Sequence, residues 1–229
     1  MRSLAALVAI FLSFAARPLA AQEIAYEPVS VESTAELVGG GERFVRARTA
    51  AVPEGIAAFG PFRVLSRTHA ALVDVTDARS PAAFAAMMSA FPQIALLEMV
   101  ECPGTEDDRA NLRLGRMIRA AGVATWVPDG GSVRSGGVEL FLAGKQRYAD
   151  PGAEFAVHAW MDVDGREATD YAASAPENAK YLAYYRQMGM TEAEARAFYA
   201  MTNSVRHDDA LWLSGREMAG WVRLDASDG

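Results

Sequence analysis

The sequence predicts an α/β fold whose main strands run parallel. From residue 70 to residue 160, apolar segments of strand length alternate with segments whose apolar residues follow helical spacing. The run from Ile94 to Val100 is almost continuously apolar, which is typical of a strand buried on both faces. Capping residues precede the helical segments. The order strand–helix–strand implies right-handed crossovers and a layered core.

Local signals place the elements of the first half. The expected strands are residues 70–75, 94–100 and 123–127. A helix is expected from Pro81 to Ala90, because Ser80 can cap it and proline suits a first helical turn. A second helix is expected from Ala110 to Ala121, because its apolar residues recur every three to four positions, Thr105-x-x-Asp108 resembles a capping box and Gly122 can end it.

The stretch from Asp129 to Trp160 carries the candidate chemistry. A glycine-rich turn leads into a short apolar helix expected from Val138 to Ala143, with Gly144 as its stop. A Pro-Gly turn and an expected strand, Phe155 to Trp160, follow, and His158 lies in that strand. A serine at the start of a buried helix, with a histidine on the next strand, can act as nucleophile and base. The alternative interpretation is a turn before a core helix, with a core histidine.

Three capped helices are expected after Trp160. Their capping signals are Ser174-x-Pro176-Glu177, Thr191-x-x-Glu194 and Ser214-x-x-Glu217. Apolar stripes follow the first two, from Tyr181 to Met188 and from Ala195 to Tyr199. The simpler interpretation of their tyrosines is core packing.

Residues 1–21 have the features of a secretory signal. Arg2 precedes an apolar run from Leu4 to Ala16, and Leu19-Ala20-Ala21 offers a cleavage site. The apolar run is short for a bilayer span, so an uncleaved anchor is the lesser alternative. The sequence therefore predicts an exported product, periplasmic or secreted, with no stable membrane insertion after cleavage. Residues 22–62 are interpreted as an N-terminal addition to a main domain of residues 63–229.

Composition excludes several classes of function. The chain has 229 residues, a formal net charge of -7 and only two lysines, so nucleic-acid binding is not expected. Cys102 is the single cysteine, which excludes an internal disulfide and suggests a small buried side chain. The three histidines lie far apart, and no spacing typical of metal ligands occurs, so neither a metal nor a cofactor is expected.

Several short motifs occur together in one order: Ser135-Gly-Gly-Val-Glu-Leu-Phe-Leu-Ala-Gly144, then Arg147-Tyr-Ala-Asp-Pro151, then Val157-His158. This order resembles the Clp protease proteolytic-subunit and crotonase superfamily, and within it a group of bacterial predicted periplasmic proteins. The resemblance runs from about His69 to Trp221. It implies a repeated ββα-type layered core with C-terminal helices.

The resemblance also implies a catalytic site. Ser135, nine residues before Gly144, would be the nucleophile, and His158, 23 residues after it, the base. Ser132 is the rival nucleophile. Asp209 would orient the histidine, with Asp208 as the alternative. The oxyanion would be held by Gly136 and Gly104.

The sequence departs from the family pattern at two of these places. Arg134 stands before the serine where the Clp pattern has small residues. Thr105 replaces the second glycine of the oxyanion loop, and three acidic residues follow it, Glu106 to Asp108. Both departures bear on whether the site is active.

The function expected from these residues is that of an exported serine hydrolase. It would catalyse peptidase-like acyl transfer on a peptide or protein without a cofactor. The resemblance implies a homo-oligomer, for which the two C-terminal apolar stripes offer contacts. The main alternative is a catalytically lapsed relative that binds a peptide or protein partner in the same groove. A crotonase-type acyl-CoA enzyme and a dyad of Ser135 with Lys145 are weaker alternatives.

Overall fold

The structure of the protein, a computed structural model, describes residues 50–226, which all belong to one unit of the chain. The expected signal segment and the N-terminal addition up to residue 49 lie outside this part. Within the described residues, no helix is long and apolar enough to span a bilayer.

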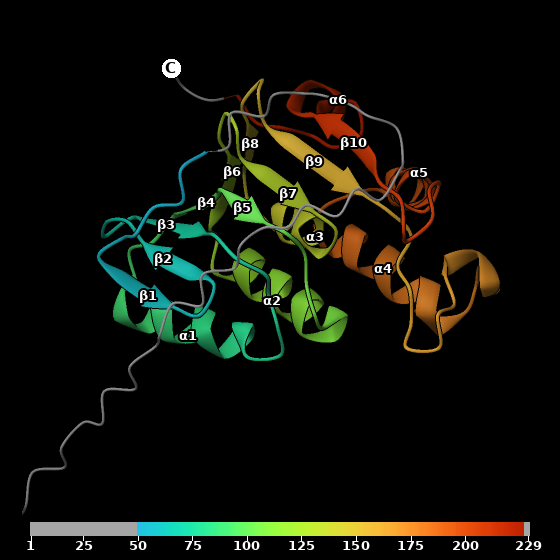
Figure 1. The fold of residues 1–229 in the computed structure, drawn as a ribbon, viewed down its shortest axis with the longest axis horizontal. Coiled ribbons are helices and arrows are strands. Elements are labelled where there is room, and N and C mark those ends of the chain that lie inside the picture. Colours follow the sequence, from blue (N-terminus) through green and yellow to red (C-terminus); the bar gives the residue numbers. More distant parts are fainter. Residues whose placement is uncertain (1–49, 227–229) are drawn as a thin grey trace, which may run out of the picture. The chain divides into compact units, whose positions relative to one another are not determined.

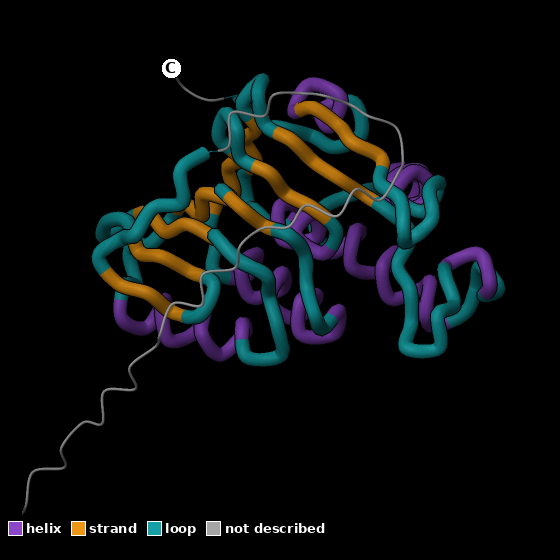
Figure 2. Tube along the Cα trace, viewed as in Figure 1, coloured by secondary structure: helices purple, strands orange, loops and turns teal. Residues whose placement is uncertain are grey.

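A six-stranded sheet forms one layer of the fold (Figures 1 and 2). Four of its strands run parallel, in the order β3-β4-β6-β8, and the hairpin β1-β2 extends it antiparallel beside β3. The strands are β1 Ala57–Phe59, β2 Phe62–Val64, β3 His69–Leu72, β4 Leu96–Met99, β6 Ala124–Val127 and β8 Arg147–Ala149. The α/β class is therefore confirmed, with a mixed sheet in which the four main strands run parallel.

A second sheet has four strands in the order β10-β9-β7-β5. The strands are β5 Glu101–Cys102, β7 Ser132–Arg134, β9 Glu154–Val157 and β10 Leu211–Ser214. The first three in chain order are parallel, whereas β10 runs antiparallel to β9. Strands β7 and β10 were not expected from the sequence. Ser132 and Val133 were interpreted as part of the glycine-rich turn but belong to β7, and Leu211 to Leu213 looks like the approach to the last helix but forms most of β10.

The two sheets are connected by a repeated unit of two strands and a helix. Each unit places one strand in the large sheet and the next in the small sheet, and then enters a helix. The units are β4-β5-α2, β6-β7-α3 and β8-β9 followed by α4, with α2 Asp108–Ala120, α3 Gly136–Leu142 and α4 Pro176–Gln187. This is the expected ββα arrangement. The other helices are α1 Ser80–Ala90, η1 Ala168–Asp170, α5 Glu192–Thr202 and α6 Gly215–Ala219.

The capping signals were correct for two helices and wrong for three. Ser80 is the first residue of α1, and the N-cap position is Arg79, which makes no side-chain cap hydrogen bond. The boxes at Thr191 and Ser214 are formed. Helix α2 is instead capped by Asp107, whose Oδ1 accepts the N–H of Ala110 at 2.9 Å, because the Thr105 hydroxyl donates to the carbonyl of another segment. Helix α4 begins after Ala175 without a side-chain cap.

The tyrosines of the C-terminal helices belong to the core. Tyr184 is 0% exposed, and Tyr181, Tyr185 and Phe198 are buried as well. Core packing is therefore confirmed for these stripes. The buried residues of these stripes are covered by the chain itself, and the expected homo-oligomer stays a prediction. Cys102 is buried as expected, and burial raises the pKa of its thiol well above the ordinary value.

Candidate active site

The candidate site lies where three parallel strands of the small sheet end. Arg134 of β7 pairs with Ala156 of β9, and the N–H of Ser135 donates to the Ala156 carbonyl at 2.9 Å. The chain therefore reaches Ser135 and His158 at neighbouring strand ends. On the other side, β5 ends just before Gly104. This register brings the expected nucleophile, base and oxyanion loop to one edge of the sheet.

Ser135 has a strained backbone. Its φ is 48° and its ψ is -129°, and among the described residues it is the one non-glycine residue with a positive φ. Such a conformation costs of the order of 1–3 kcal/mol and persists where the surrounding structure enforces it, often at active sites. Ser135 occupies the N-cap position of α3, but its side chain does not cap the helix. The hydroxyl makes no hydrogen bond within residues 50–226 and is free to react.

Ser132 and Arg134 lie away from this pocket. Ser132 is buried in β7, and its Oγ accepts a hydrogen bond from Arg134 Nη1 at 2.7 Å. The other end of the Arg134 guanidinium pairs with Glu101 of β5. Arg134 therefore turns away from the side chain of Ser135, and its bulk does not fill the pocket.

The expected oxyanion glycines are placed against the nucleophile. Gly104 has φ +134°, and a Cβ added there would lie 3.1 Å from the Cβ of Ser135. Gly136 is the first residue of α3, so its N–H has no carbonyl one turn earlier to bond. A Cβ on Gly136 would lie 2.6 Å from Cγ2 of Thr105. Thr105 itself does not adopt a positive φ, so it causes none of the strain that replacing a glycine can bring.

A buried polar network that sequence analysis missed holds these loops together. The Asn111 side chain of α2 donates to the Gly136 carbonyl at 2.7 Å and accepts the Thr76 hydroxyl at 3.0 Å. The N–H of Thr76 donates to the Gly104 carbonyl at 3.0 Å. Thr105 Oγ1 donates to the Thr76 carbonyl at 3.2 Å. Asn111 and Thr76 are both buried. The backbone carbonyls of Gly136 and Gly104 are therefore held by groups that solvent does not reach.

We expect Asn111→Ala to lower the free energy of unfolding by about 2–4 kcal/mol, because it leaves the Gly136 carbonyl and the Thr76 hydroxyl buried without this partner. Urea unfolding followed by circular dichroism measures the change. Arg113→Ala, at an exposed position of the same helix, is the control and should stay within about 0.5 kcal/mol. An Asn111→Ala chain as stable as the control would contradict this role of the network.

His158 is paired with a second histidine. The Nδ1 atoms of His158 and His207 lie 2.9 and 3.1 Å from the Ala159 carbonyl oxygen, and the two rings meet edge-on with centroids 4.7 Å apart. A carbonyl oxygen only accepts, so both Nδ1 atoms carry the hydrogen in this arrangement. That leaves Nε2 of His158 as an acceptor. The motifs of the sequence do not include His207, whereas the structure places it in the same pocket as His158.

The expected acid is not brought to His158. β10 pairs with β9, and Leu211 lies opposite Val157. The segment just before β10 therefore runs close to His158. The side chain of Asp209 is nevertheless exposed and accepts the N–H of Ala210 at 2.7 Å. The alternative, Asp208, is exposed and pairs with Arg206 at 3.2 Å. The carbonyl of Ala159 thus occupies the place expected for a carboxylate.

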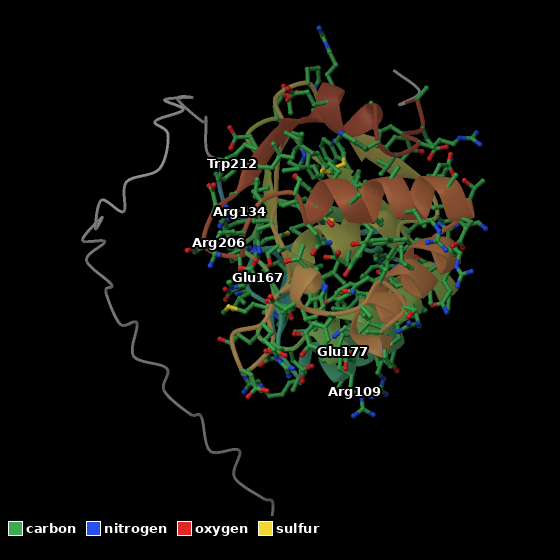
Figure 3. All side chains as sticks on the ribbon, turned by 90° about the vertical axis from the view of Figure 1, so that its right-hand side faces the viewer. Arg109, Arg134, Glu167, Glu177, Arg206 and Trp212 are labelled. Carbon is green, nitrogen blue, oxygen red and sulfur yellow. The ribbon has the colours of Figure 1, made fainter. Side chains whose placement is uncertain are left out.

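His207 is anchored by Glu167. The backbone N–H of His207 donates to Oε1 of Glu167 at 3.1 Å. Nη2 of Arg206 lies 3.9 Å from the same oxygen (Figure 3). The N–H of Ala159 donates to the Val205 carbonyl at 3.0 Å, which ties the two histidine-bearing segments together.

Ser135, Gly136, His158 and His207 line one pocket of about 450 Å³. Its other walls come from the start of α2, from helices α4 and α5, and from the loop after β9. The charged lining residues are Glu106, Asp107, Asp108, Glu139 and Asp162 against Arg109 and Lys180. The volume suits a small ligand or a segment of peptide. Lys145 is exposed and does not line the pocket, so the geometry does not favour a dyad with Ser135.

Glu139 is a carboxyl group enclosed in this pocket. Burial, offset in part by a hydrogen bond from the Tyr185 hydroxyl at 2.8 Å, raises the pKa of Glu139 to about 7. Sequence analysis did not single it out, because one glutamate in an apolar helix gives no signal of its partners. Across residues 50–226, no group of three or more histidine, cysteine or acidic side chains is arranged to hold a metal ion.

The chain is similar to several solved structures. No protein-family model matches the chain, and no curated protein matches it. A mutant of ClpP1 from Listeria monocytogenes is similar, with 13% identity over 68% of this chain and 87% of that chain and a TM-score of 0.48. The chain is thus similar to ClpP1 over about two thirds of its length.

Two structures of a second protein are similar as well. One is a mutant of the 1510-N membrane-bound stomatin-specific protease in complex with a substrate peptide, with 16% identity over 67% of this chain and 74% of that chain and a TM-score of 0.44. The other is a further mutant of that protease, with 15% identity, 69% and 78% coverage and a TM-score of 0.45. At these identities the likeness concerns the fold alone.

Proposed function

We propose that the protein is a serine hydrolase that transfers the acyl group of a peptide or protein substrate to water. The observation that carries this proposal is the backbone of Ser135, held at φ 48° at the end of β7 with a free hydroxyl in the pocket. A structural N-cap serine adopts an ordinary extended conformation and uses its hydroxyl on the helix. Ser135 does neither.

The reaction follows from the groups around Ser135. The Oγ attacks the carbonyl carbon of the substrate while Nε2 of His158 takes its proton. The N–H groups of Gly136 and Gly104 stabilise the negative oxygen that forms. His158 then returns the proton to the leaving amine, and an acyl ester on Ser135 remains. A water molecule, deprotonated by His158, attacks this ester, and the proton passes back to the Ser135 oxygen as the acid product leaves.

In this mechanism the Ala159 carbonyl and His207 orient the His158 ring, the role expected of an aspartate. The carbonyl holds the hydrogen on Nδ1 of His158, which keeps Nε2 available as the base. The edge-on ring of His207 restricts rotation of the His158 ring. A carbonyl dipole stabilises the imidazolium less than a full negative charge does, so the rate should be moderate.

Hydrolysis of acylated peptide esters and amides by the purified chain tests the proposal. Release of the leaving group should occur with wild-type protein and stop after treatment with a fluorophosphonate, which esterifies nucleophilic serines. Folded protein that hydrolyses none of these substrates and is unaffected by the reagent would speak against it.

A binding protein that uses the same pocket without turnover is the second candidate. The exposed position of Asp209 is the observation that favours it, because the Asp209 carboxylate accepts the N–H of Ala210 and makes no hydrogen bond to His158. Peptide binding by a folded chain that no fluorophosphonate labels would select this candidate.

We further propose that the protein is exported, on the evidence of residues 1–21. The charged start, apolar run and small-residue site predict cleavage near Ala21. Expression in a Gram-negative host followed by fractionation should give a periplasmic product whose first residue is near Ala21 or Gln22. Intact Met1 on cytoplasmic protein would contradict export.

We also propose that the protein forms a homo-oligomer. Trp212 of the edge strand β10 (Figure 3) and Trp221 are each 40% exposed, and they are apolar surface that a second copy can cover. Light scattering of the mature protein decides the question, and a monomer at high concentration would overturn the proposal.

A further inference from the structure

The pocket beside Ser135 contains two carboxyl groups that no cation of the described chain neutralises. Glu139 lies one turn after Ser135 on α3, and Asp108 is the first residue of α2. Each accepts one tyrosine hydroxyl, Glu139 from Tyr185 at 2.8 Å and Asp108 from Tyr181 at 2.6 Å. Neither takes part in an ion pair within residues 50–226.

The oxygens of these carboxyl groups can accept more hydrogen bonds than the one tyrosine hydroxyl provides to each. A carboxylate offers about four positions for hydrogen-bond donors. An enclosed negative charge is costly unless a cation or several donors accompany it. Burial and, to a lesser degree, the neighbouring Asp108 raise the pKa of Glu139 to about 7. A cation that enters the pocket would therefore bind to Glu139 and favour its ionised form.

A separate feature of the pocket also favours a cation. The ammonium group of Lys180 lies 5.5 Å from the ring centroid of Trp160 and 4.9 Å from that of Tyr181. Both rings line the same pocket, and the faces of such rings attract positive charge. Lys180 is exposed and makes no ion pair with a described residue, so its ammonium group can move into solvent when another cation takes its place.

We propose that this pocket binds the side chain of a lysine or arginine of the substrate, and that Glu139 is the residue that selects it. The inference rests on the proposed function, since the carbonyl to be cleaved would lie at Ser135. From there the side chain would run along α3 to Glu139. One helical turn advances about 5.4 Å, a span that an extended lysine or arginine side chain covers.

Two substrates that differ only in charge test the selection. One carries lysine before the cleaved bond, and the other carries norleucine, which has the same carbon chain without the ammonium group. Wild-type protein should show a kcat/KM about tenfold or more higher for lysine, the scale of one charge-assisted hydrogen bond. Glu139→Gln should bring the ratio close to one. Glu192→Gln, a charge-matched control on the exposed face of α5, should keep the wild-type ratio.

The preference for lysine should depend on pH in a defined direction. The pKa of Glu139 is about 7, so the carboxyl is mainly ionised at pH 8 and mainly protonated at pH 6. The groups that face it are Asp108 of α2 and the hydroxyls of Tyr181, Tyr184 and Tyr185 on α4. The ratio of lysine to norleucine should therefore rise from pH 6 to pH 8 in wild-type protein and stay flat in Glu139→Gln. A wild-type ratio that is flat or falls over this range would contradict the role of Glu139.

Binding to a chain without the nucleophile separates this inference from the proposed function. Titration calorimetry of the two peptides with Ser135→Ala should give the tighter Kd for the lysine peptide. Equal Kd values would overturn the inference, whatever happens at Ser135. A lysine preference in Ser135→Ala, with no fluorophosphonate labelling of wild-type protein, would support the inference while the proposed function fails.

Discussion

Ser135→Ala is expected to lower kcat/KM for peptide esters by about four orders of magnitude, because a nucleophile and its base act as one unit. The variant should still fold, since the Ser135 hydroxyl makes no hydrogen bond within the described residues. Alanine also has to adopt the positive φ of this position, so a modest loss of stability is expected. Initial rates and a urea unfolding curve on the same preparation separate the two effects.

Ser132→Ala is the matched control for this prediction. Ser132 lies three residues earlier, with its hydroxyl held by Arg134 away from the pocket. The variant should keep kcat/KM within about threefold of wild type, the range of a residue without contact to the reacting atoms. A large loss in Ser132→Ala with normal rates in Ser135→Ala would move the nucleophile to Ser132.

His158→Ala is expected to lower kcat by about a thousandfold, the usual contribution of a positioned general base. His158 follows β9 directly and lines the pocket with Ser135. Binding of peptide should change much less, so the effect falls on kcat and not on KM. Single-turnover kinetics measures the chemical step directly. Rates that survive in His158→Ala would require another base.

Variants of His207 and Asp209 are expected to differ in how strongly they lower kcat. His207→Ala should reduce kcat by about 10- to 100-fold through misplacement of the base. His207→Gln should restore part of the loss, because an amide N–H can still donate to the Ala159 carbonyl. Asp209→Asn should have no effect on kcat, because the carboxylate is exposed and bonds its own neighbour. A large loss in Asp209→Asn would return this acid to the mechanism.

The strand–helix pattern was enough to predict the fold class and to place Ser135 and His158 at the ends of neighbouring strands. Apolar runs located β4, β6 and β9 within a few residues, and parallel strands bring their carboxyl ends to one edge of a sheet. A residue that follows β7 and one that follows β9 therefore come together almost regardless of the side chains between them. Gly104 after β5 belongs to the same edge for the same reason.

The orienting group could not be predicted, because it depends on side-chain direction and not on strand order. Asp209 lies in the segment that leads into β10 beside β9, but its carboxylate accepts the N–H of Ala210. The acceptor that His158 uses instead is a backbone carbonyl, which no residue type reveals. The hydrogen bond between Thr76 and Asn111 joins residues 35 positions apart, so local sequence patterns do not predict it.

Mass spectrometry of wild-type protein after reaction with a fluorophosphonate tests most directly whether this protein is a serine hydrolase. The mature folded chain should gain one adduct, and peptide mapping should place it on Ser135, with no adduct on heat-unfolded protein. An adduct on another residue, or an unmodified chain whose native fold is verified by circular dichroism, would contradict the assignment of Ser135 as the nucleophile.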